Sequence, residues 1–161
     1  MLTRRRVGPT LAAALAATPA IAQTAIHPAE DYRRAANLFR SGRRDEAVYW
    51  LYRGQYRYRV HLAARPGLAR DGDPALFASL SESVGRPINE YAFGDLPALL
   101  AILDRVIAEA RAEDDGFTPK AQFPGAHRGT LAGLAALRDQ IDWSRDAIRA
   151  QRLRNGLSNR N

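Results

Sequence analysis

The sequence predicts an all-α fold, in which a single small domain forms an irregular bundle of four to five helices. Apolar residues recur three and four positions apart in several segments, which is the spacing of one helix face. Proline and glycine separate these segments, and no stretch alternates convincingly like a strand. We expect the helical domain to cover residues 23–154, and residues 155–161 to be a polar, frayed tail.

The first two predicted helices open this domain. One starts at Pro28, has carboxylates in its first turn and ends near residue 40, before Ser41-Gly42. The other spans about residues 45–64 and ends at Arg65-Pro66-Gly67. This second helix is apolar on several faces, so we expect it to be the buried spine of the core.

Two further helices are predicted in the middle of the chain. Asp73 is the expected N-cap of a short helix that ends near residue 84, because Gly85-Arg86-Pro87 follows, and residues 88–92 add one further turn. Asp95 is the expected N-cap of the next helix, which ends at Glu113-Asp114-Asp115-Gly116. Its apolar face consists of Leu96, Leu99, Leu100, Leu103, Val106, Ile107 and Ala110.

The C-terminal part is predicted to be a loop followed by one long helix. Prolines and glycines in residues 117–129 indicate an ordered loop, which Phe117 and Phe123 pin to the core. The final helix spans about residues 130–154. Its inward-facing residues are Leu131, Leu134, Leu137, Ile141 and Ile148.

Small and apolar residues in the first two predicted helices have the spacing of a known repeat. The residues that match are Ala35, Leu38, Gly42, Ala47 and Leu51. The segment from Ala35 to Tyr58 therefore resembles a single tetratricopeptide-like helical hairpin. The resemblance implies that the two helices pack as a hairpin, but it implies no peptide-binding groove, because such repeats need about three copies.

The first 22 residues have the order of a secretory signal peptide, with a basic start, an apolar middle and an A-x-A exit. The start, Thr3-Arg4-Arg5-Arg6-Val7, resembles a twin-arginine export signal, and the Sec route is the alternative. We expect cleavage after Ala22, so that the mature protein begins at Gln23 in the periplasm. The twin-arginine resemblance implies folding before export. The apolar run is shorter than the about 20 residues of a spanning helix, so no transmembrane span is expected after cleavage.

Composition excludes several kinds of site and partner. The chain has no cysteine, which rules out disulfides, thiol catalysis and cysteine-ligated metals. Its formal net charge is +7, and removing the three arginines of residues 4–6 lowers this to +4. Ten arginines lie in residues 33–70 and ten acidic residues in 71–115, so the two segments could pair across the fold. The expected compartment argues against nucleic acid and favours an acidic protein or an anionic envelope component.

One cluster of aromatic and arginine residues stands out in the second predicted helix. Its members are Tyr49, Tyr52, Arg53, Tyr56 and Arg57. They lie on neighbouring turns, where rings and guanidinium groups can stack, so they could line a groove for an anionic or carbohydrate ligand. The alternative is a buried spine whose tyrosine hydroxyl groups bond to polar partners at the edges of the core.

No catalytic, metal or cofactor site is predicted. The histidines His27, His61 and His127 form no metal-binding pair at helical spacing. Glu90 and Asp95 are the carboxylate pair nearest to a loop rich in aromatic residues, but Asp95 is better explained as a helix cap.

We therefore expect a non-enzymatic interaction module of the periplasm, which binds an unknown protein or envelope component through the cluster around Arg53. A narrower alternative is an immunity-type inhibitor of a toxin delivered to the periplasm, a task that suits a small helical domain. The alternative from another class is a cofactor-binding enzyme that is exported in the folded state, as the twin-arginine resemblance implies.

Overall fold

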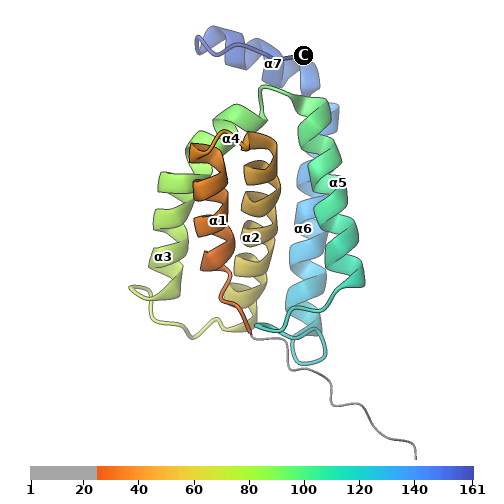
Figure 1. Cartoon of the computed structure of the whole chain (residues 1–161). Coiled ribbons are helices and arrows are strands. Elements are labelled where there is room, and N and C mark those ends of the chain that lie inside the picture. Colours follow the sequence, from red (N-terminus) through yellow and green to blue (C-terminus); the bar gives the residue numbers. More distant parts are fainter. Residues whose placement is uncertain (1–24) are drawn as a thin grey trace, which may run out of the picture.

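A computed structural model of the chain describes residues 25–161, and the predicted signal peptide, residues 1–22, lies outside them. The described part is all-α, as predicted, with seven α-helices, one π-helical turn and no strand (Figure 1). The helices are α1 (Ala29–Arg40), α2 (Arg44–Ala64), α3 (Asp73–Leu80), α4 (Arg86–Ala92), α5 (Leu96–Ala112), α6 (Pro124–Trp143) and α7 (Arg145–Arg154). None of the described helices combines the length and the apolar character that a membrane crossing requires.

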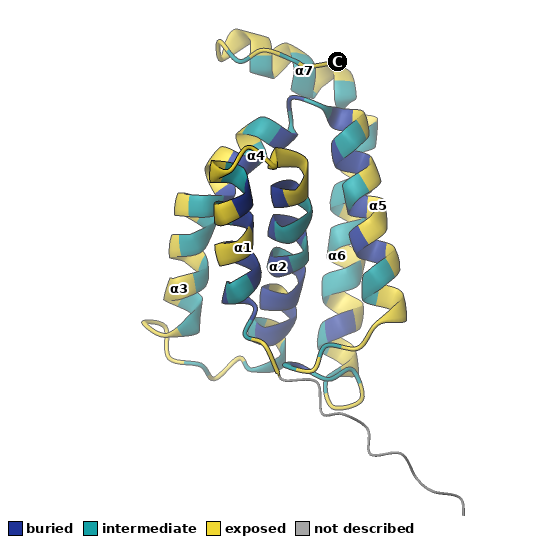
Figure 2. Cartoon of the chain, viewed as in Figure 1, coloured by how far each residue is buried: buried dark blue, intermediate teal, exposed yellow. Residues whose placement is uncertain are grey.

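Helix α2 is the spine of the core, as its apolar residues on several faces predicted. It packs against α1, α3, α4, α5 and α6. Figure 2 shows that most of its length is buried. Its largest fully buried side chains are Val48, Leu51, Tyr58 and Val60. A helix that is enclosed in this way can hold a polar side chain only where a neighbouring segment supplies a partner.

Helices α1 and α2 form a hairpin that turns at Gly42. This glycine has a φ of +84°, a conformation that residues with a side chain rarely adopt. The N–H of Arg43 donates to the carbonyl oxygen of Leu38 at 3.0 Å, and the N–H of Gly42 donates to that of Phe39 at 3.2 Å. These two bonds form a Schellman motif, which ends α1 and sends the chain back along it.

The chain between α3 and α4 stays helical, although the sequence predicted a break at Gly85-Arg86-Pro87. The π-helical turn Ser81–Gly85 joins the two helices, and the N–H of Arg86 donates to the carbonyl oxygen of Ser81. This wider turn places Pro87 in the first turn of α4, where a proline needs no N–H. The predicted break was therefore wrong.

The role predicted for Asp73 was also wrong. Gly72 precedes α3, and Asp73 is the first helical residue. Its side chain makes no capping bond, because its carboxylate is bonded to His61. The prediction for Asp95 is confirmed: Asp95 Oδ1 accepts from the N–H of Ala98 at 3.0 Å and caps α5.

The C-terminal half differs from the prediction at two boundaries. Helix α6 begins at Pro124 rather than Thr130, because proline is favourable in the first turn of a helix. The predicted single helix is divided at Ser144, and α7 turns across the end of the bundle (Figure 1). Ile141 is the last buried residue of α6, and the turn allows Ile148 to pack back against the core.

Residues 155–161, which were expected to fray, lie against the junction of α4 and α5. The N–H of Arg160 donates to the carbonyl oxygen of Gly94 at 2.6 Å. The side-chain amide of Asn161 donates to Asp95 Oδ1 at 2.9 Å. The tail and α7 thus cover the end of the bundle that lies away from the start of α1.

Candidate functional site

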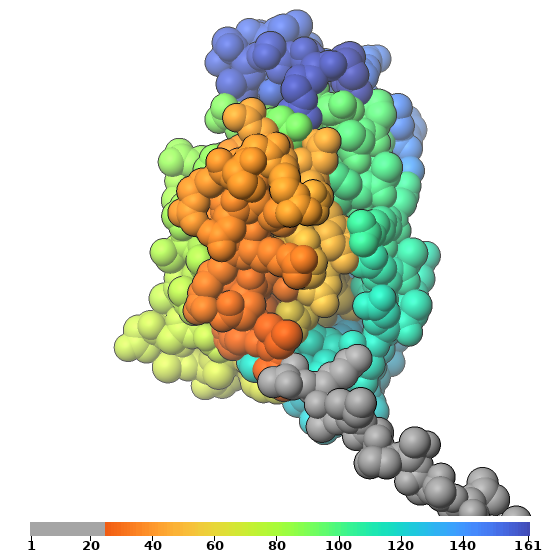
Figure 3. Space-filling view, viewed as in Figure 1, coloured from red at the N-terminus to blue at the C-terminus, as the bar shows by residue number. Residues whose placement is uncertain are grey.

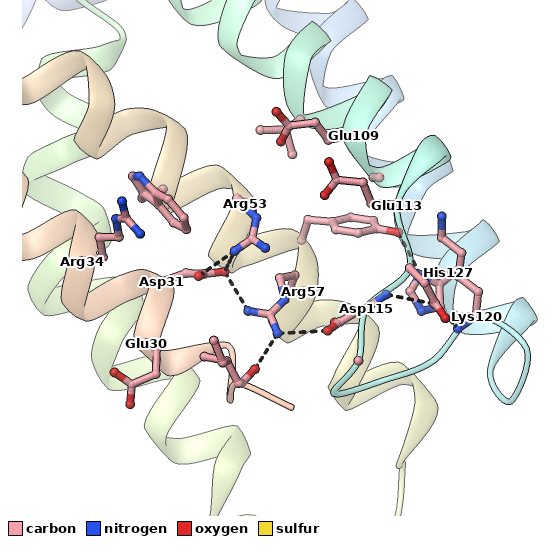
Figure 4. Close-up of a pocket in the computed structure, with 17 residues that line it drawn as sticks. Glu30, Asp31, Arg34, Arg53, Arg57, Glu109, Glu113, Asp115, Lys120 and His127 are labelled. Atoms are coloured by element: carbon pink, nitrogen blue, oxygen red, sulfur yellow. Dashed lines mark hydrogen bonds and ion pairs between the residues drawn. The ribbon is translucent and has the colours of Figure 1, made fainter. Parts of the chain in front are cut away.

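A pocket of about 300 Å³ lies between α1 and α2 on one side and the end of α5 with its following loop on the other (Figure 4). In the space-filling view, a strip of α2 remains visible between α1 and α5 (Figure 3). Six carboxylates and four basic side chains line this charged pocket. The acidic residues are Glu30, Asp31, Glu109, Glu113, Asp114 and Asp115, and the basic ones are Arg34, Arg53, Arg57 and Lys120.

The floor of the charged pocket is built around the buried carboxylate of Asp31. Arg53 Nη1 donates to both oxygens of Asp31 at 2.8 Å, and Arg57 Nη1 donates to Oδ2 at 3.0 Å. Helix α1 reaches this position because Gly54 has no side chain, since a Cβ there would lie 2.9 Å from Asp31 Cβ. Arg53 and Arg57 are neighbours on one face of α2, so a single carboxylate from α1 fixes both guanidinium groups.

Arg57 joins several segments of the chain. Its side chain is only 9% exposed, and its Nη2 donates to Asp115 Oδ1 at 3.0 Å and to the carbonyl oxygen of Ile26 at 2.5 Å. Burial alone would lower the pKa of Arg57, but the carboxylates of Asp115 and Asp31 outweigh burial and raise it. The guanidinium therefore stays charged and serves as a fixed hub of the pocket floor.

Asp115 contributes a carboxylate that is only partly satisfied. Its Oδ1 accepts from Arg57 and from the N–H of Phe117 at 3.0 Å. Its Oδ2 is buried and has no hydrogen-bond partner among the described residues, although the side chain is only 8% exposed. A buried acceptor without a donor destabilises a protein by about 1–3 kcal/mol.

The wall formed by α1 and α2 presents two arginines that stack on one indole. The guanidinium carbon of Arg34 lies 3.8 Å from the centre of the Trp50 ring, and that of Arg53 lies 5.0 Å from it. Arg34 makes no ion pair with any described residue, and Arg53 engages Asp31 only through Nη1. This basic wall, Arg34 and Arg53, therefore has N–H groups left for a ligand.

The opposite wall is acidic and is formed by Glu109 and Glu113 (Figure 4). Glu109 accepts from the Tyr49 hydroxyl at 2.6 Å and from Arg105 Nε at 2.8 Å. Partial burial would raise the pKa of Glu109, but these hydrogen bonds outweigh burial and lower it, so the carboxylate is charged at neutral pH. Glu113 is exposed and has no ion-pair partner within residues 25–161. Glu109 and Glu113 together are termed the acidic wall.

Tyr56 and His127 close the pocket beside α6. His127 Nε2 lies 2.6 Å from the carbonyl oxygen of Thr118, which can only accept, so Nε2 carries a hydrogen. In the neutral ring, Nδ1 accepts from the Tyr56 hydroxyl at 3.0 Å. Burial, together with the charge of Asp115, raises the pKa of Tyr56 to about 12. The hydroxyl is therefore a donor that keeps its proton at neutral pH.

The five residues of the predicted cluster lie in different surroundings. Arg53, Tyr56 and Arg57 line the charged pocket. Tyr49 lies beside it through its bond to Glu109, and Tyr52 is buried in the core with 2% of its surface exposed. The helix therefore combines the two predicted roles, since three of these residues face a cavity and Tyr52 belongs to the buried spine.

Sequence reasoning missed the acidic residues of this site. Asp31 was assigned to a helix start and Asp115 to a helix end, and neither position has a local signal of burial. Each meets Arg57 from far away in the sequence, across 26 and 58 positions. The division of charge between residues 33–70 and 71–115 could have indicated Asp115, because Arg57 and Asp115 pair across it, but Asp31 lies outside both segments.

A second polar cluster, formed by His27, His61 and Asp73, brings three possible metal-ligand atoms within 4.8 Å of one another. His61 Nδ1 lies 2.8 Å from Arg65 Nη1, and His27 Nδ1 lies 3.2 Å from the backbone nitrogen of Ala29. Both neighbours can only donate, so both Nδ1 atoms accept. Each Nε2 then carries a hydrogen, and it faces Asp73 at 2.7 Å from His61 and 3.4 Å from His27.

This arrangement does not fit a metal site. A metal-binding histidine normally donates from its second nitrogen, whereas both second nitrogens here accept. The hydrogen bonds and ion pairs of this cluster link the segment before α1 to α2 and α3. The hydrogen bond from His61 is the main reason why the pKa of Asp73 lies below its usual value. Phe117 packs against both imidazole rings, with ring centres 4.8 and 5.0 Å away.

Comparisons of this chain with protein-family models, with curated proteins and with solved structures found no match. The fold and the site define a small helical protein with a charged, partly enclosed pocket.

Proposed function

We propose that this protein is a non-enzymatic binding module of the periplasm, which recognises an envelope component or another protein through the charged pocket. The observation that carries the proposal is the ion-pair network of Asp31, Arg53, Arg57 and Asp115 at the pocket floor. This network holds four side chains in fixed positions before any ligand arrives. Preorganised polar groups of this kind lower the entropic cost of binding.

The protonation states of the pocket support binding rather than proton transfer. The pKa of Arg57 is raised, that of Tyr56 is raised to about 12 and that of Glu109 is lowered. Each of these groups therefore keeps one charge state around neutral pH. A general acid or base works best with a pKa near the operating pH, which these groups do not have.

Export is the part of the proposal that the sequence of residues 1–22 supports. The protein purified from the periplasm is expected to begin at Gln23 when its N-terminus is sequenced. Replacing Arg4 and Arg5 by lysine is expected to leave the precursor in the cytoplasm, because the twin-arginine route reads this pair. A double variant that is still exported and cleaved would contradict that route and favour Sec. Unprocessed protein in the periplasm would contradict the cleavage site.

The binding proposal is tested with the mature chain, residues 23–161, immobilised and exposed to periplasmic proteins and to sedimented envelope material. Arg53→Gln is expected to reduce capture strongly, because it removes a charge of the basic wall. Arg59→Gln is the matched control, since Arg59 is an exposed arginine of α2 that does not line the charged pocket. Equal capture by Arg53→Gln and the unaltered chain would show that recognition takes place elsewhere.

A further inference from the structure

We infer that the charged pocket takes a zwitterionic amino-acid group, with its carboxylate on the basic wall and its ammonium on the acidic wall. The inference rests on the proposed function, because it names the chemical group that the pocket recognises. Its basis is a pair of arginines on one side of the cavity and a pair of glutamates on the other, whereas the lining residues Glu30 and Lys120 bond elsewhere, to Arg33 and to the carbonyl oxygen of Arg111. Arg34 and Arg53 lie on the side of α1 and α2, and Glu109 of α5 and Glu113, the residue after α5, lie on the opposite side (Figure 4).

The basic wall suits a carboxylate. A guanidinium group is planar and presents N–H donors in pairs, which match the two oxygens of a carboxylate. Trp50 holds the guanidinium groups of Arg34 and Arg53 against its ring, so both are positioned before a ligand binds. Asp31 engages only Nη1 of Arg53, so the other N–H groups of Arg53 can serve a ligand.

The acidic wall and the pocket floor suit an ammonium group. An ammonium has three N–H donors, and ionised carboxylates can only accept. Glu113 offers an exposed carboxylate that forms no ion pair with a residue of the described chain. Asp115 Oδ2 adds a buried acceptor that lacks a donor. An ammonium at the acidic wall would supply donors to Glu113, and the buried carboxylate of Asp115 adds negative charge at the pocket floor.

The charge pattern favours a zwitterion over simpler ligands. A ligand with only negative charge would face Glu109 and Glu113. A ligand with only positive charge would face the two arginines of the basic wall. A ligand that carries both charges pairs with both walls, and like charges then stay apart. The volume of about 300 Å³ lies at the small end of ligand sites, which fits an amino acid or one such unit of a larger molecule.

Calorimetric titration of the mature chain tests the inference. The probes are glycine, L-alanine, 4-aminobutyrate and 6-aminohexanoate, which vary the spacing between the two charges. Butylamine and butyrate are the matched controls, because each keeps one charge of 4-aminobutyrate. At least one zwitterion is expected to bind, and the single-charge controls are expected to bind about tenfold more weakly or not at all, since each loses one charge-assisted contact.

Substitutions on the two walls identify the site. Glu113→Gln and Arg34→Gln are each expected to weaken binding of that zwitterion by about tenfold. Glu90→Gln and Arg40→Gln are the controls, since both residues are exposed and lie outside the charged pocket. Circular dichroism melting of each variant checks that the fold is intact, as expected for exposed positions. Unchanged affinity in both wall variants would overturn the inference.

The remaining outcomes separate this inference from the proposed function. Equal affinity for butylamine or for butyrate would overturn the zwitterion assignment. If no probe binds but capture still depends on Arg53, the inference falls and the binding module stands. If no probe binds and nothing is captured, both fall. A zwitterion that binds and also displaces the chain from envelope material assigns the group to an envelope component, whereas binding without displacement assigns a free amino acid.

Discussion

Asp31 and Gly54 lie so close across the interface of α1 and α2 that a Cβ on residue 54 would be 2.9 Å from Asp31 Cβ. We predict that Gly54→Ala lowers the free energy of unfolding by about 1–3 kcal/mol, because α1 must move away from a well-packed position. The intrinsic helix preference of alanine offsets part of this loss. Urea unfolding followed by circular dichroism measures the change.

Gly133→Ala is the matched control for that substitution. Gly133 lies within α6, and no atom lies within 4 Å of the place where its Cβ would be. This change is expected to stabilise the protein by up to about 1 kcal/mol through helix preference alone. Equal effects of the two alanine variants would contradict the close approach of α1 and α2.

The carboxylate of Asp31 forms ion pairs with the guanidinium groups of Arg53 and Arg57, so its removal should strongly destabilise the fold. We predict that Asp31→Ala destabilises the fold by about 3–5 kcal/mol, because the buried charge of Arg57 loses one of its partners. Asp139→Ala, an exposed carboxylate on α6, is the control and should change little. Denaturant titration of both variants provides the measurement. A loss below about 1 kcal/mol for Asp31→Ala would show that the network does not hold the helices together.

The lowered pKa of Glu109 predicts a contribution to acid sensitivity. The folded-state pKa lies below the ordinary value of 4.5, so ionised Glu109 stabilises the fold above that value, and this stabilisation is lost as the pH falls through the folded-state pKa. We therefore expect Glu109→Gln to have a shallower fall of unfolding free energy between about pH 5 and pH 3. Glu90→Gln should keep the slope of the unaltered chain. Identical slopes in all three proteins would contradict the assignment.

The buried tyrosine hydroxyl groups are expected to ionise at a higher pH than free tyrosine does. Burial raises the pKa values of Tyr32, Tyr49, Tyr56 and Tyr58 to about 12. Ultraviolet titration should show little tyrosinate in the folded protein at about pH 10.5, where the tyrosines of the urea-unfolded chain are mostly ionised. Because unfolding then releases protons, the free energy of unfolding should fall as the pH rises above about 10. Full ionisation in the folded state near pH 10 would refute the burial of these hydroxyl groups.

Local features of the sequence predicted most of the fold, and long-range contacts account for the errors. Asp95 was predicted as a cap because its partner, the N–H of Ala98, is three residues away. Asp73 was predicted as a cap on similar local grounds, but its carboxylate forms a hydrogen bond with His61 of α2 instead. The apolar periodicity of the sequence likewise gives no signal for the π-helical turn Ser81–Gly85 or for the break between α6 and α7 at Ser144.

The sequence pointed to the part of the candidate site that lies on α2, but not to the part that other segments contribute. The spacing of aromatic and arginine residues predicted a binding cluster on α2, and its members Arg53, Tyr56 and Arg57 line the charged pocket. Asp31 and Asp115 were missed because acidic residues at helix ends usually have local roles as caps and terminators. Only the folded chain shows that both carboxylates meet Arg57.

Because Arg57 bonds to segments far away in the sequence, we expect the pocket floor to assemble late in folding. The Arg57 side chain bonds backwards over 31 positions to Ile26 and forwards over 58 positions to Asp115. Closing such long loops costs conformational entropy, so these contacts form only when many others support them. A fragment that ends before residue 115 lacks the second carboxylate and cannot assemble the floor. An assembled pocket floor therefore indicates that the chain from Ile26 to Asp115 has folded.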